Sequence, residues 1–255
     1  MRVFITGASS GIGTALAKHY AASGTQLGLV GRNQERLQQL ANELGANCAI
    51  YVLDVRDATA LQQAAADFLT RFGAPNIVIA NAGVSRGTLT EHAEDITAFK
   101  AVMDINVMGM VHTFQPFIAA MKQAGSGSLV GIASVAGLRG IPGASAYSAS
   151  KAAAITYLES LRVELIGTGI NVTTICPGYI RTPMTDVNPY PMPFLMEPDT
   201  AARKMARIIQ KKRRIAITPW QMGFVGVLMR FLPPIVWDWV MRKAPHKPRL
   251  DWDWL

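Results

Sequence analysis

The fold of this chain is decided by residues 6–13, which read Thr6-Gly7-Ala8-Ser9-Ser10-Gly11-Ile12-Gly13. This stretch directly follows the apolar run 2–6 and opens a helical pattern that continues to residue 22. Glycines at such a turn permit a tight bend and let a pyrophosphate approach the backbone, and the helix amino terminus then stabilises the negative charge. The stretch predicts a dinucleotide-binding turn. Its alternative is a tight strand–helix connection without a ligand.

Short apolar runs and helical patterns alternate along the chain on either side of this turn. The apolar runs are 3–6, 27–30, 49–53, 76–80, 128–133 and 171–176, with a last candidate at 214–218. The helical patterns are 13–22, 34–44, 58–72, 96–121 and 148–166. Continuous apolar strands separated by helices are typical of a parallel sheet covered on both faces. We therefore expect a doubly wound α/β domain over residues 1–218, followed by a different kind of segment over 219–255.

The composition limits the class of protein. Half of the 255 residues are apolar, which excludes a disordered chain. Charged residues make up only 16%, and the mean hydropathy is +0.20, so we expect large buried faces, a subunit interface or a greasy partner. The two cysteines and four scattered histidines have no metal-ligand spacing, so we expect no metal site. No targeting segment precedes the first apolar run, and no run of about 20 apolar residues is present, so we expect a cytoplasmic protein.

Tyr147 and Lys151 form the clearest catalytic pattern. They stand four residues apart on an expected helix, so both side chains lie on one face. A lysine ammonium near a phenol favours the phenolate and so lowers its pKa, which lets the tyrosine exchange a proton with a carbonyl or alcohol oxygen. Ser134, at the end of an expected strand, is placed to hydrogen-bond the same oxygen. The alternative is that Tyr147 packs in a helix interface and Lys151 is solvated.

Several motifs in a fixed order carry a family resemblance. They are the 6–13 turn, Leu53-Asp54-Val55, Asn81-Ala82-Gly83, Asn106-Val107-Met108-Gly109, Ser134, Tyr147-Ser148-Ala149-Ser150-Lys151 and Pro177-Gly178-Tyr179-Ile180-Arg181-Thr182. With these motifs the chain resembles the short-chain dehydrogenase/reductase family, in its short single-domain form. The resemblance covers about residues 2–183 and implies a Rossmann-type sheet of about seven strands.

The resemblance also implies roles for individual residues. Lys151 holds the nicotinamide ribose, and Asn106 positions a water molecule in a proton relay to Lys151. Asn106, Ser134, Tyr147 and Lys151 are the expected catalytic residues. The expected cofactor-binding residues are Gly7, Ser9, Ser10, Gly11, Ile12, Gly13, Arg32, Asp54, Val55, Asn81, Ala82, Gly83, Tyr147, Lys151, Pro177, Gly178, Ile180 and Thr182.

The end of the second strand bears on which cofactor is used. Enzymes that use NAD place an acid there for the ribose hydroxyls, whereas this chain has Arg32 and no acid before Glu35. An arginine suits a phosphate, so we expect NADP(H) in preference to NAD(H). Ser10 departs from this pattern, because some NADP-preferring family members carry a second basic residue there. The alternative role of Arg32 is a solvated residue at a helix start.

The positive charge is concentrated near the end of the chain. Residues 1–199 carry a net charge of −1 and residues 200–255 carry +9. A basic cluster at 203–214 precedes an apolar stretch at 221–232 and the tryptophans Trp237 and Trp239. This combination predicts helices lying on an anionic membrane surface, peripheral on the inner face of a membrane. Two compatible alternatives are that the helices cap the substrate pocket or pack on another subunit.

These observations favour an NADPH-dependent carbonyl reductase, or the reverse alcohol dehydrogenase, with a small lipophilic substrate. The family resemblance also implies a homo-oligomer. Two rivals share the fold: a non-catalytic dinucleotide-sensing or scaffold protein, and a sugar-nucleotide-modifying relative of the extended form. A nucleic-acid partner is not expected, because the basic tail shows no aromatic–basic interleaving or recognition-helix pattern.

Overall fold

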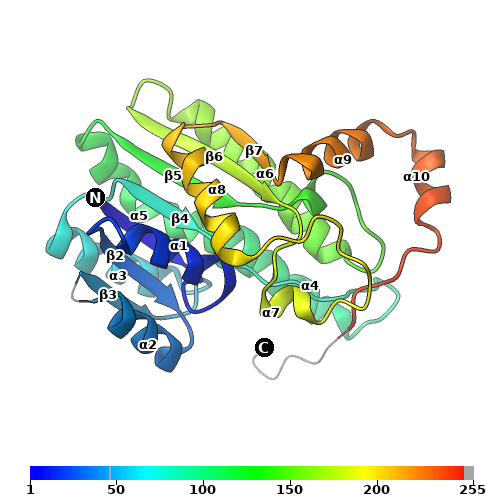
Figure 1. Ribbon diagram of the computed structural model, residues 1–255, viewed down its shortest axis with the longest axis horizontal. Helices are drawn as coiled ribbons and strands as arrows, with labels where there is room; N and C mark the ends of the chain where they lie inside the picture. The colour runs from blue at the N-terminus through cyan, green and yellow to red at the C-terminus, as the bar shows by residue number, and fades with distance from the viewer. Residues whose placement is uncertain (46, 250–255) are drawn as a thin grey trace.

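The computed structural model describes residues 1–45 and 47–249 (Figure 1). Its centre is a parallel sheet of seven strands in the order β3-β2-β1-β4-β5-β6-β7. The strands are β1 (Arg2–Thr6), β2 (Gln26–Gly31), β3 (Cys48–Val52), β4 (Ile77–Ala80), β5 (Gly127–Ile132), β6 (Ile170–Pro177) and β7 (Ile215–Thr218). The chain moves outward from β1 to β3 and then returns to place β4 beside β1. This reversal creates the switch point at which such sheets bind ligands, and it confirms the doubly wound α/β fold.

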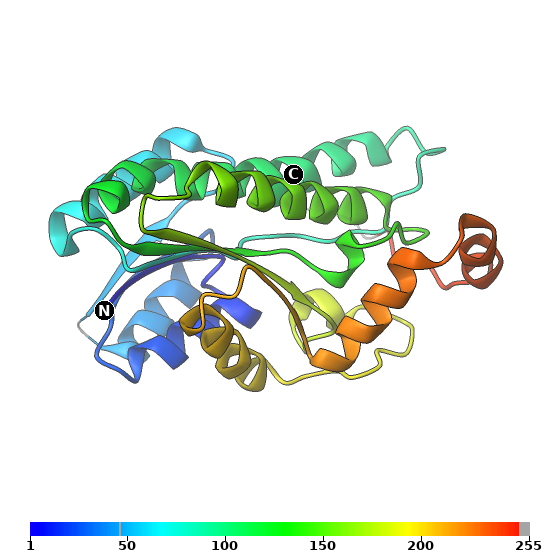
Figure 2. The ribbon, with the colours of Figure 1, turned by 90° about the horizontal axis from the view of Figure 1, so that it is seen from above.

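Helices cover both faces of the sheet (Figure 2). One face carries α1 (Gly11–Ala21), α2 (Gln34–Leu44) and α8 (Pro198–Gln210), and α1 packs against α8. The other face carries α3 (Ala58–Phe72), α5 (Gly109–Gln123) and α6 (Ser145–Glu164), with α4 (Asp95–Met103) packed on α6. The helices thus enclose the strands in a three-layer structure.

Strand β1 shows why the apolar runs are continuous. Val3 and Ile5 pack into the core under α1 and α8, whereas Phe4 between them packs into the core under α3 and α5. All three side chains are fully buried. Because successive side chains of a strand point to opposite faces, a sheet covered on both sides needs apolar residues at every position.

The structure corrects two expectations about the helices. The pattern at 96–121 is not one helix, because a π-helical turn at Asp104–Met108 separates α4 from α5. Helix α8 was not among the expected helices, although its buried residues Ala201, Met205 and Ile209 recur at helical spacing. The proline-rich loop before it and the short helix α7 (Pro183–Asp186) obscure that pattern in the sequence.

The chain leaves the sheet after β7 and forms α9 (Trp220–Phe231) and α10 (Pro234–Met241) at one end of the molecule (Figures 1 and 2). Arg139 fixes this pair to the body of the protein. Its guanidinium donates to the carbonyl oxygens of Met229 at 2.9 Å and Leu232 at 2.7 Å, and it lies 5.1 Å from the centre of the Trp237 ring. A cation that binds the free carbonyls at a helix end stabilises that end.

Within the described residues, no single helix is long and apolar enough to cross a membrane. Helices α9 and α10 reach the necessary length and composition only when taken together, with a bend of 119° between them.

Candidate active site

The turn between β1 and α1 depends on the absence of side chains. Gly7 and Gly11 have φ angles of 68° and 55°, in the left-handed region that favours glycine. A Cβ atom on Gly13 would collide with the carbonyl oxygen of Gly7. Asn81, which follows β4, braces the same turn by donating from Nδ2 to the carbonyl oxygens of Thr6 at 3.0 Å and Gly7 at 3.2 Å. The turn is therefore tight, and it is joined to the strand beside it.

The amino terminus of α1 is open at this turn. Its N-cap residue Ser10 makes no side-chain hydrogen bond to the helix, and the first turn of the helix contains no acid. The first amides of a helix lack partners within it, and the helix dipole places partial positive charge there. This end of α1 therefore suits the pyrophosphate of a dinucleotide.

Two arginines share one carboxylate at the ends of β2 and β3. Arg56 Nη2 lies 2.9 Å and Arg32 Nη1 lies 3.7 Å from Asp54 Oδ2. Burial acts to raise the pKa of Asp54, but hydrogen bonds from Arg56 and the charges of both arginines outweigh it, so this pKa lies below its ordinary value. The cluster is thus a carboxylate with two cations. Arg56 was not among the expected site residues, because only the folded chain brings it beside Arg32.

Ser134, Tyr147 and Lys151 meet above the ends of β5 and β6. Ser134 follows β5, and its hydroxyl accepts a hydrogen bond from the backbone N–H of Ala136 at 3.1 Å and is hydrogen-bonded to Tyr147. Lys151 Nζ lies 5.7 Å from the centre of the Tyr147 ring and donates to the carbonyl oxygen of Ile132 at 2.9 Å. The structure thus brings the three expected catalytic side chains together.

The pKa of Tyr147 is raised, although the sequence predicts that Lys151 lowers it. Burial raises it above its ordinary value, and the hydrogen bond with Ser134 only opposes that rise. Burial also lowers the pKa of Lys151 to about 8, against the opposite influence of Cys176. The expected lowering of the tyrosine pKa by the lysine is wrong, because both groups are taken out of water and burial is the largest influence on each pKa. The Tyr147 phenol remains protonated at neutral pH and is poised as a proton donor.

Asn106 lies behind this group, in the π-helical turn. Its Oδ1 accepts from the backbone N–H of Val84 at 2.8 Å, and its Nδ2 donates to the Val84 carbonyl at 3.0 Å and to Ser150 Oγ at 2.9 Å. Ser150 in turn donates to the carbonyl oxygen of Tyr147 at 2.8 Å. Asn106 therefore ties the loop after β4 to α6, and its role in a water relay stays a prediction. Turns of this type are frequent at functional sites.

A cavity of about 160 Å³ joins the first turn to the catalytic side chains. The expected residues that line it are Gly7, Ser10, Gly11, Ile12, Asn81, Ala82, Gly83, Ser134, Tyr147, Lys151, Pro177, Gly178, Ile180 and Thr182. The other expected residues, Ser9, Gly13, Arg32, Asp54, Val55 and Asn106, do not line it. Ser9 and Arg32 line two neighbouring surface grooves.

A second and larger pocket of about 470 Å³ shares Ser134 and Tyr147 with this cavity. Its lining is mainly apolar. Part of the wall comes from the 184–193 loop, and part comes from Met222, Met229 and Trp237 of the C-terminal helices. The reactive hydroxyls therefore stand where the two spaces meet.

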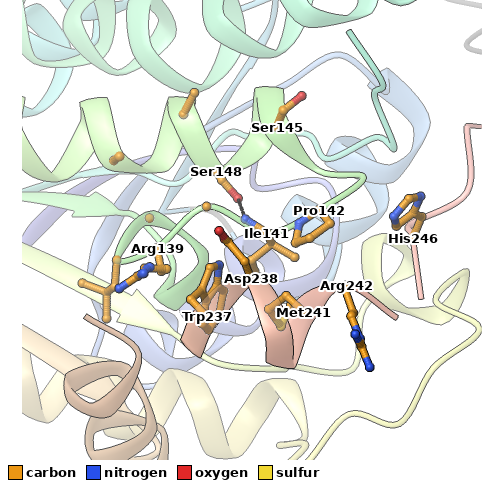
Figure 3. A pocket seen from close by; sticks show the side chains of 15 residues that line it. Arg139, Ile141, Pro142, Ser145, Ser148, Trp237, Asp238, Met241, Arg242 and His246 are labelled. Atoms are coloured by element: carbon orange, nitrogen blue, oxygen red, sulfur yellow. Dashed lines mark hydrogen bonds between the residues drawn. The ribbon is translucent and has the colours of Figure 1, made fainter. Parts of the chain in front are cut away.

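An outer groove of about 740 Å³ runs between α10 and the start of α6. Figure 3 shows Trp237 and Met241 of α10 facing Ile141 and Pro142. These four residues line the inner pocket as well as the groove. Helix α10 is thus part of the wall between the apolar pocket and the surface. This position agrees with the alternative that the C-terminal helices cap the substrate pocket.

The residues around the cavity suit a nicotinamide dinucleotide. The cavity has an uncapped helix end for the pyrophosphate, a turn with no room for a Cβ atom, and a buried lysine beside two hydroxyls. The short-chain dehydrogenase model matches residues 1–190 of the sequence. The chain belongs to the short-chain dehydrogenase/reductase family. It is an oxidoreductase of this family, and the predicted resemblance is confirmed.

Relatives and solved structures within the family agree on the architecture. The sequence is 32% identical over 262 residues to 11-beta-hydroxysteroid dehydrogenase 1A of Arabidopsis thaliana, which covers 94% of this chain and 74% of that protein. The closed form of a serine dehydrogenase complexed with NADP⁺ superposes with a TM-score of 0.76 at 28% identity, covering 82% of this chain and 88% of that one. A 3-ketoacyl-(acyl-carrier-protein) reductase from Brucella melitensis complexed with NADH gives a TM-score of 0.75 at 25% identity, covering 85% and 94%.

Replacing Tyr147 with phenylalanine tests its role. The Tyr147→Phe change removes the proton donor but keeps the ring, so kcat for carbonyl reduction should fall by about 10²-fold or more while cofactor affinity is retained. Steady-state kinetics and NADPH fluorescence titration measure the two effects. Near-normal turnover in a folded variant would show that another group donates the proton.

The buried lysine predicts an alkaline limit to activity. Because burial lowers the pKa of Lys151 to about 8, its positive charge is present below that pH and is lost as the pH rises through it. With a neutral ketone as substrate, kcat/KM for reduction should fall through about pH 8. In Lys151→Arg, whose side chain stays charged, the residual activity should not fall in that range. If kcat/KM falls through about pH 8 in both proteins, the titrating group is not Lys151.

Proposed function

We propose that this enzyme interconverts a carbonyl and a secondary alcohol on a lipophilic substrate, with NADP(H) as cofactor. The observation that carries the proposal is the position of Ser134 and Tyr147, at the junction of the cofactor cavity and an apolar pocket. A substrate in that pocket would present its carbonyl to both hydroxyls, beside the cavity that would hold the cofactor. The relative named as a hydroxysteroid dehydrogenase supports a lipophilic substrate.

The side chains divide the chemistry among them. The bound nicotinamide supplies the hydride in reduction and accepts it in oxidation. Tyr147 gives its phenolic proton to the carbonyl oxygen, and Ser134 hydrogen-bonds the same oxygen as negative charge develops. Lys151, with its buried ammonium, stabilises the phenolate that remains and binds the nicotinamide ribose. In the reverse direction the same groups remove the alcohol proton.

A screen of ketones and alcohols with purified protein tests this function, with NADPH absorbance as the readout. Cofactor-dependent turnover that is lost in Tyr147→Phe supports the enzyme. Tight NADPH binding without turnover of any carbonyl or alcohol would favour the non-catalytic dinucleotide sensor. Activity confined to sugar nucleotides would favour the extended relative.

The preference for NADP(H) rests on Arg32 and Arg56. A 2′-phosphate at the end of β2 would meet the guanidinium groups of Arg32 and Arg56, which lie 3.7 Å and 2.9 Å from Asp54 Oδ2. Arginine binds phosphate through charge-assisted hydrogen bonds. The NADP⁺ complex among the structural neighbours supports this preference, and the NADH complex shows that the fold also accepts the other cofactor.

Reversing the charge at Arg32 tests the preference. Arg32→Asp should weaken NADPH binding by about 10- to 100-fold, because it removes a cation and adds repulsion against the 2′-phosphate, while NADH binding changes far less. Fluorescence titration of both cofactors measures the difference. Arg71→Asp on α3, an exposed site paired with Asp67, is the matched control and should change neither affinity. Equal losses for both cofactors in Arg32→Asp would show that Arg32 does not bind the phosphate.

We also propose that the protein forms a homo-oligomer through the face that carries α4 and α6. Ile96 and Phe99 of α4 and the neighbouring Met108 are exposed apolar side chains on this face. Exposed apolar groups that lie together are typical of subunit interfaces. Light scattering with size-exclusion chromatography gives the oligomeric state.

Peripheral attachment to the cytoplasmic side of a membrane is proposed for α9 and α10. Trp220, Phe224, Phe231, Ile235 and Trp239 are 66–81% exposed on these helices. Apolar side chains of this size gain free energy when they enter the lipid interface. The basic turn at 211–214 precedes β7, and the apolar helices follow it, so the two features lie at opposite ends of that strand. The apolar side chains are therefore the main contact, and the basic residues attract the anionic surface from farther away.

Vesicle co-sedimentation tests this attachment. The protein should bind anionic vesicles more than neutral ones, and high salt should weaken binding but leave a hydrophobic part. Phe231→Ser should lower the bound fraction at every salt concentration, whereas Ile166→Ser, at an equally exposed position after α6, should not. Changing Lys211, Lys212, Arg213 and Arg214 to glutamine should imitate high salt without affecting NADPH binding. If the folded protein does not bind anionic vesicles at low salt, the proposed membrane attachment is wrong. Helices α9 and α10 would then serve only as part of the pocket wall.

A further inference from the structure

Lys247 is the one charged side chain among the described residues that line the apolar pocket. The remaining lining is apolar or neutral, including the catalytic Ser134 and Tyr147 at the junction with the cofactor cavity. Lys247 is only 8% exposed. A lysine is almost never this deeply buried unless its charge is paired. We therefore expect a negatively charged group to bind Lys247 in this apolar wall.

The chain directly after Lys247 is anchored at two residues. The carbonyl oxygen of Pro248 accepts a hydrogen bond from the N–H of Gly87 at 3.1 Å. The Arg249 guanidinium donates to Asp95 Oδ2 and to Glu94 Oε1, each at 2.8 Å. Residues 244–249 thus form a strap that runs from α10 back to α4 and holds Lys247 in the pocket wall.

The ammonium of Lys247 has a single neutral acceptor in the described part of the chain. Nζ donates to the carbonyl oxygen of Met184 at 3.0 Å. Glu94 and Asp95, at the start of α4, are bound by Arg249. Burial lowers the pKa of Lys247 to about 8, and no carboxylate within residues 1–45 and 47–249 offsets this effect. At neutral pH the pocket therefore holds a cation with unused donor capacity.

We propose that Lys247 binds an anionic group, a carboxylate, of the lipophilic substrate whose carbonyl lies at Ser134 and Tyr147. This inference rests on the proposed function and names its substrate class: an amphipathic oxo or hydroxy acid. The apolar lining receives the hydrocarbon body, and the carboxylate completes the ammonium's hydrogen bonds. A charge-assisted pair in an apolar pocket discriminates strongly against a neutral analogue, because that analogue leaves the buried cation without its counter-ion.

A different role for Lys247 is that of a latch, which holds the 184–193 loop closed through the Met184 carbonyl. A latch affects every substrate equally, because the loop lines the pocket whatever the ligand. A carboxylate-binding lysine affects acids and leaves their esters unchanged. The charge of the substrate therefore separates the two roles.

The experiment compares oxododecanoates, with the ketone at successive carbons, and their methyl esters, using enzyme saturated with NADPH. Wild-type kcat/KM should favour the best acid over its ester by about tenfold or more. Lys247→Met should lower kcat/KM for the acid by about 10- to 100-fold and leave the ester within about twofold. Lys247→Arg should keep most of the preference. Lys243→Met removes an exposed lysine from the same segment and should change neither substrate.

Calorimetric binding of dodecanoate and dodecanol provides a readout that does not need turnover. If the wild type binds dodecanoate more tightly than dodecanol and Lys247→Met loses this preference, the carboxylate site is supported. If no oxo acid is reduced as well, the proposed reaction fails but the carboxylate site stands. Equal losses for acid and ester in Lys247→Met would overturn the inference in favour of a latch. Wild-type enzyme that prefers neither the acid nor dodecanoate would also overturn it, without the need for any variant.

Discussion

The close approach of the first turn to the end of β4 is the constraint on which the rest of the site depends. Gly13 packs on the Gly7 carbonyl with no space for a Cβ atom, and Asn81 holds the carbonyls of Thr6 and Gly7 from the neighbouring strand. This contact joins the two halves of the sheet at its switch point. This contact directs the uncapped end of α1 toward the cavity. It also positions the loop after β4 so that Asn106 can hydrogen-bond both to that loop and to α6, the helix that carries Tyr147 and Lys151. A side chain in the turn would therefore displace the cofactor end and the catalytic end together.

Burial, more than any single charge, sets the protonation of the catalytic pair. From the sequence, Lys151 was expected to lower the pKa of Tyr147, because two residues four apart on a helix share a face. In the fold both groups lie in the interior, where the charged form of each is disfavoured, and the Lys151 ammonium donates a hydrogen bond to the backbone carbonyl of Ile132. The spacing therefore predicted the proximity of the two side chains but not the balance between desolvation and attraction. That balance depends on every layer packed around them.

The sequence was informative where a function needs residues close together in the chain. The 6–13 turn, the Tyr147–Lys151 pair and the strand that precedes Ser134 were all predicted, as was the order of elements that makes the sheet. The role of Lys247 was not predicted, because it joins its site through contact with Met184, which is far away in sequence. The role of Arg56 was not predicted, because folding is needed to bring Arg32 to the carboxylate of Asp54 that Arg56 also binds. The π-helical turn was not predicted, because it lies inside a continuous helical stretch and differs from an α-helix in its backbone hydrogen bonds. Helix α8 was missed for a different reason, since prolines and a loop stand directly before it.

The cofactor cavity and the apolar pocket differ in how much of the chain must be synthesised before their walls are complete. The wall of the cofactor cavity is supplied between Gly7 and Thr185, whereas the apolar pocket also needs α9, α10 and the strap at 244–249. Chains leave the ribosome amino terminus first, and folding begins during synthesis. The nucleotide-binding half thus has its complete lining while the segment that encloses the substrate is still being made. The lining of the apolar pocket is therefore completed later in synthesis than the lining of the cofactor cavity.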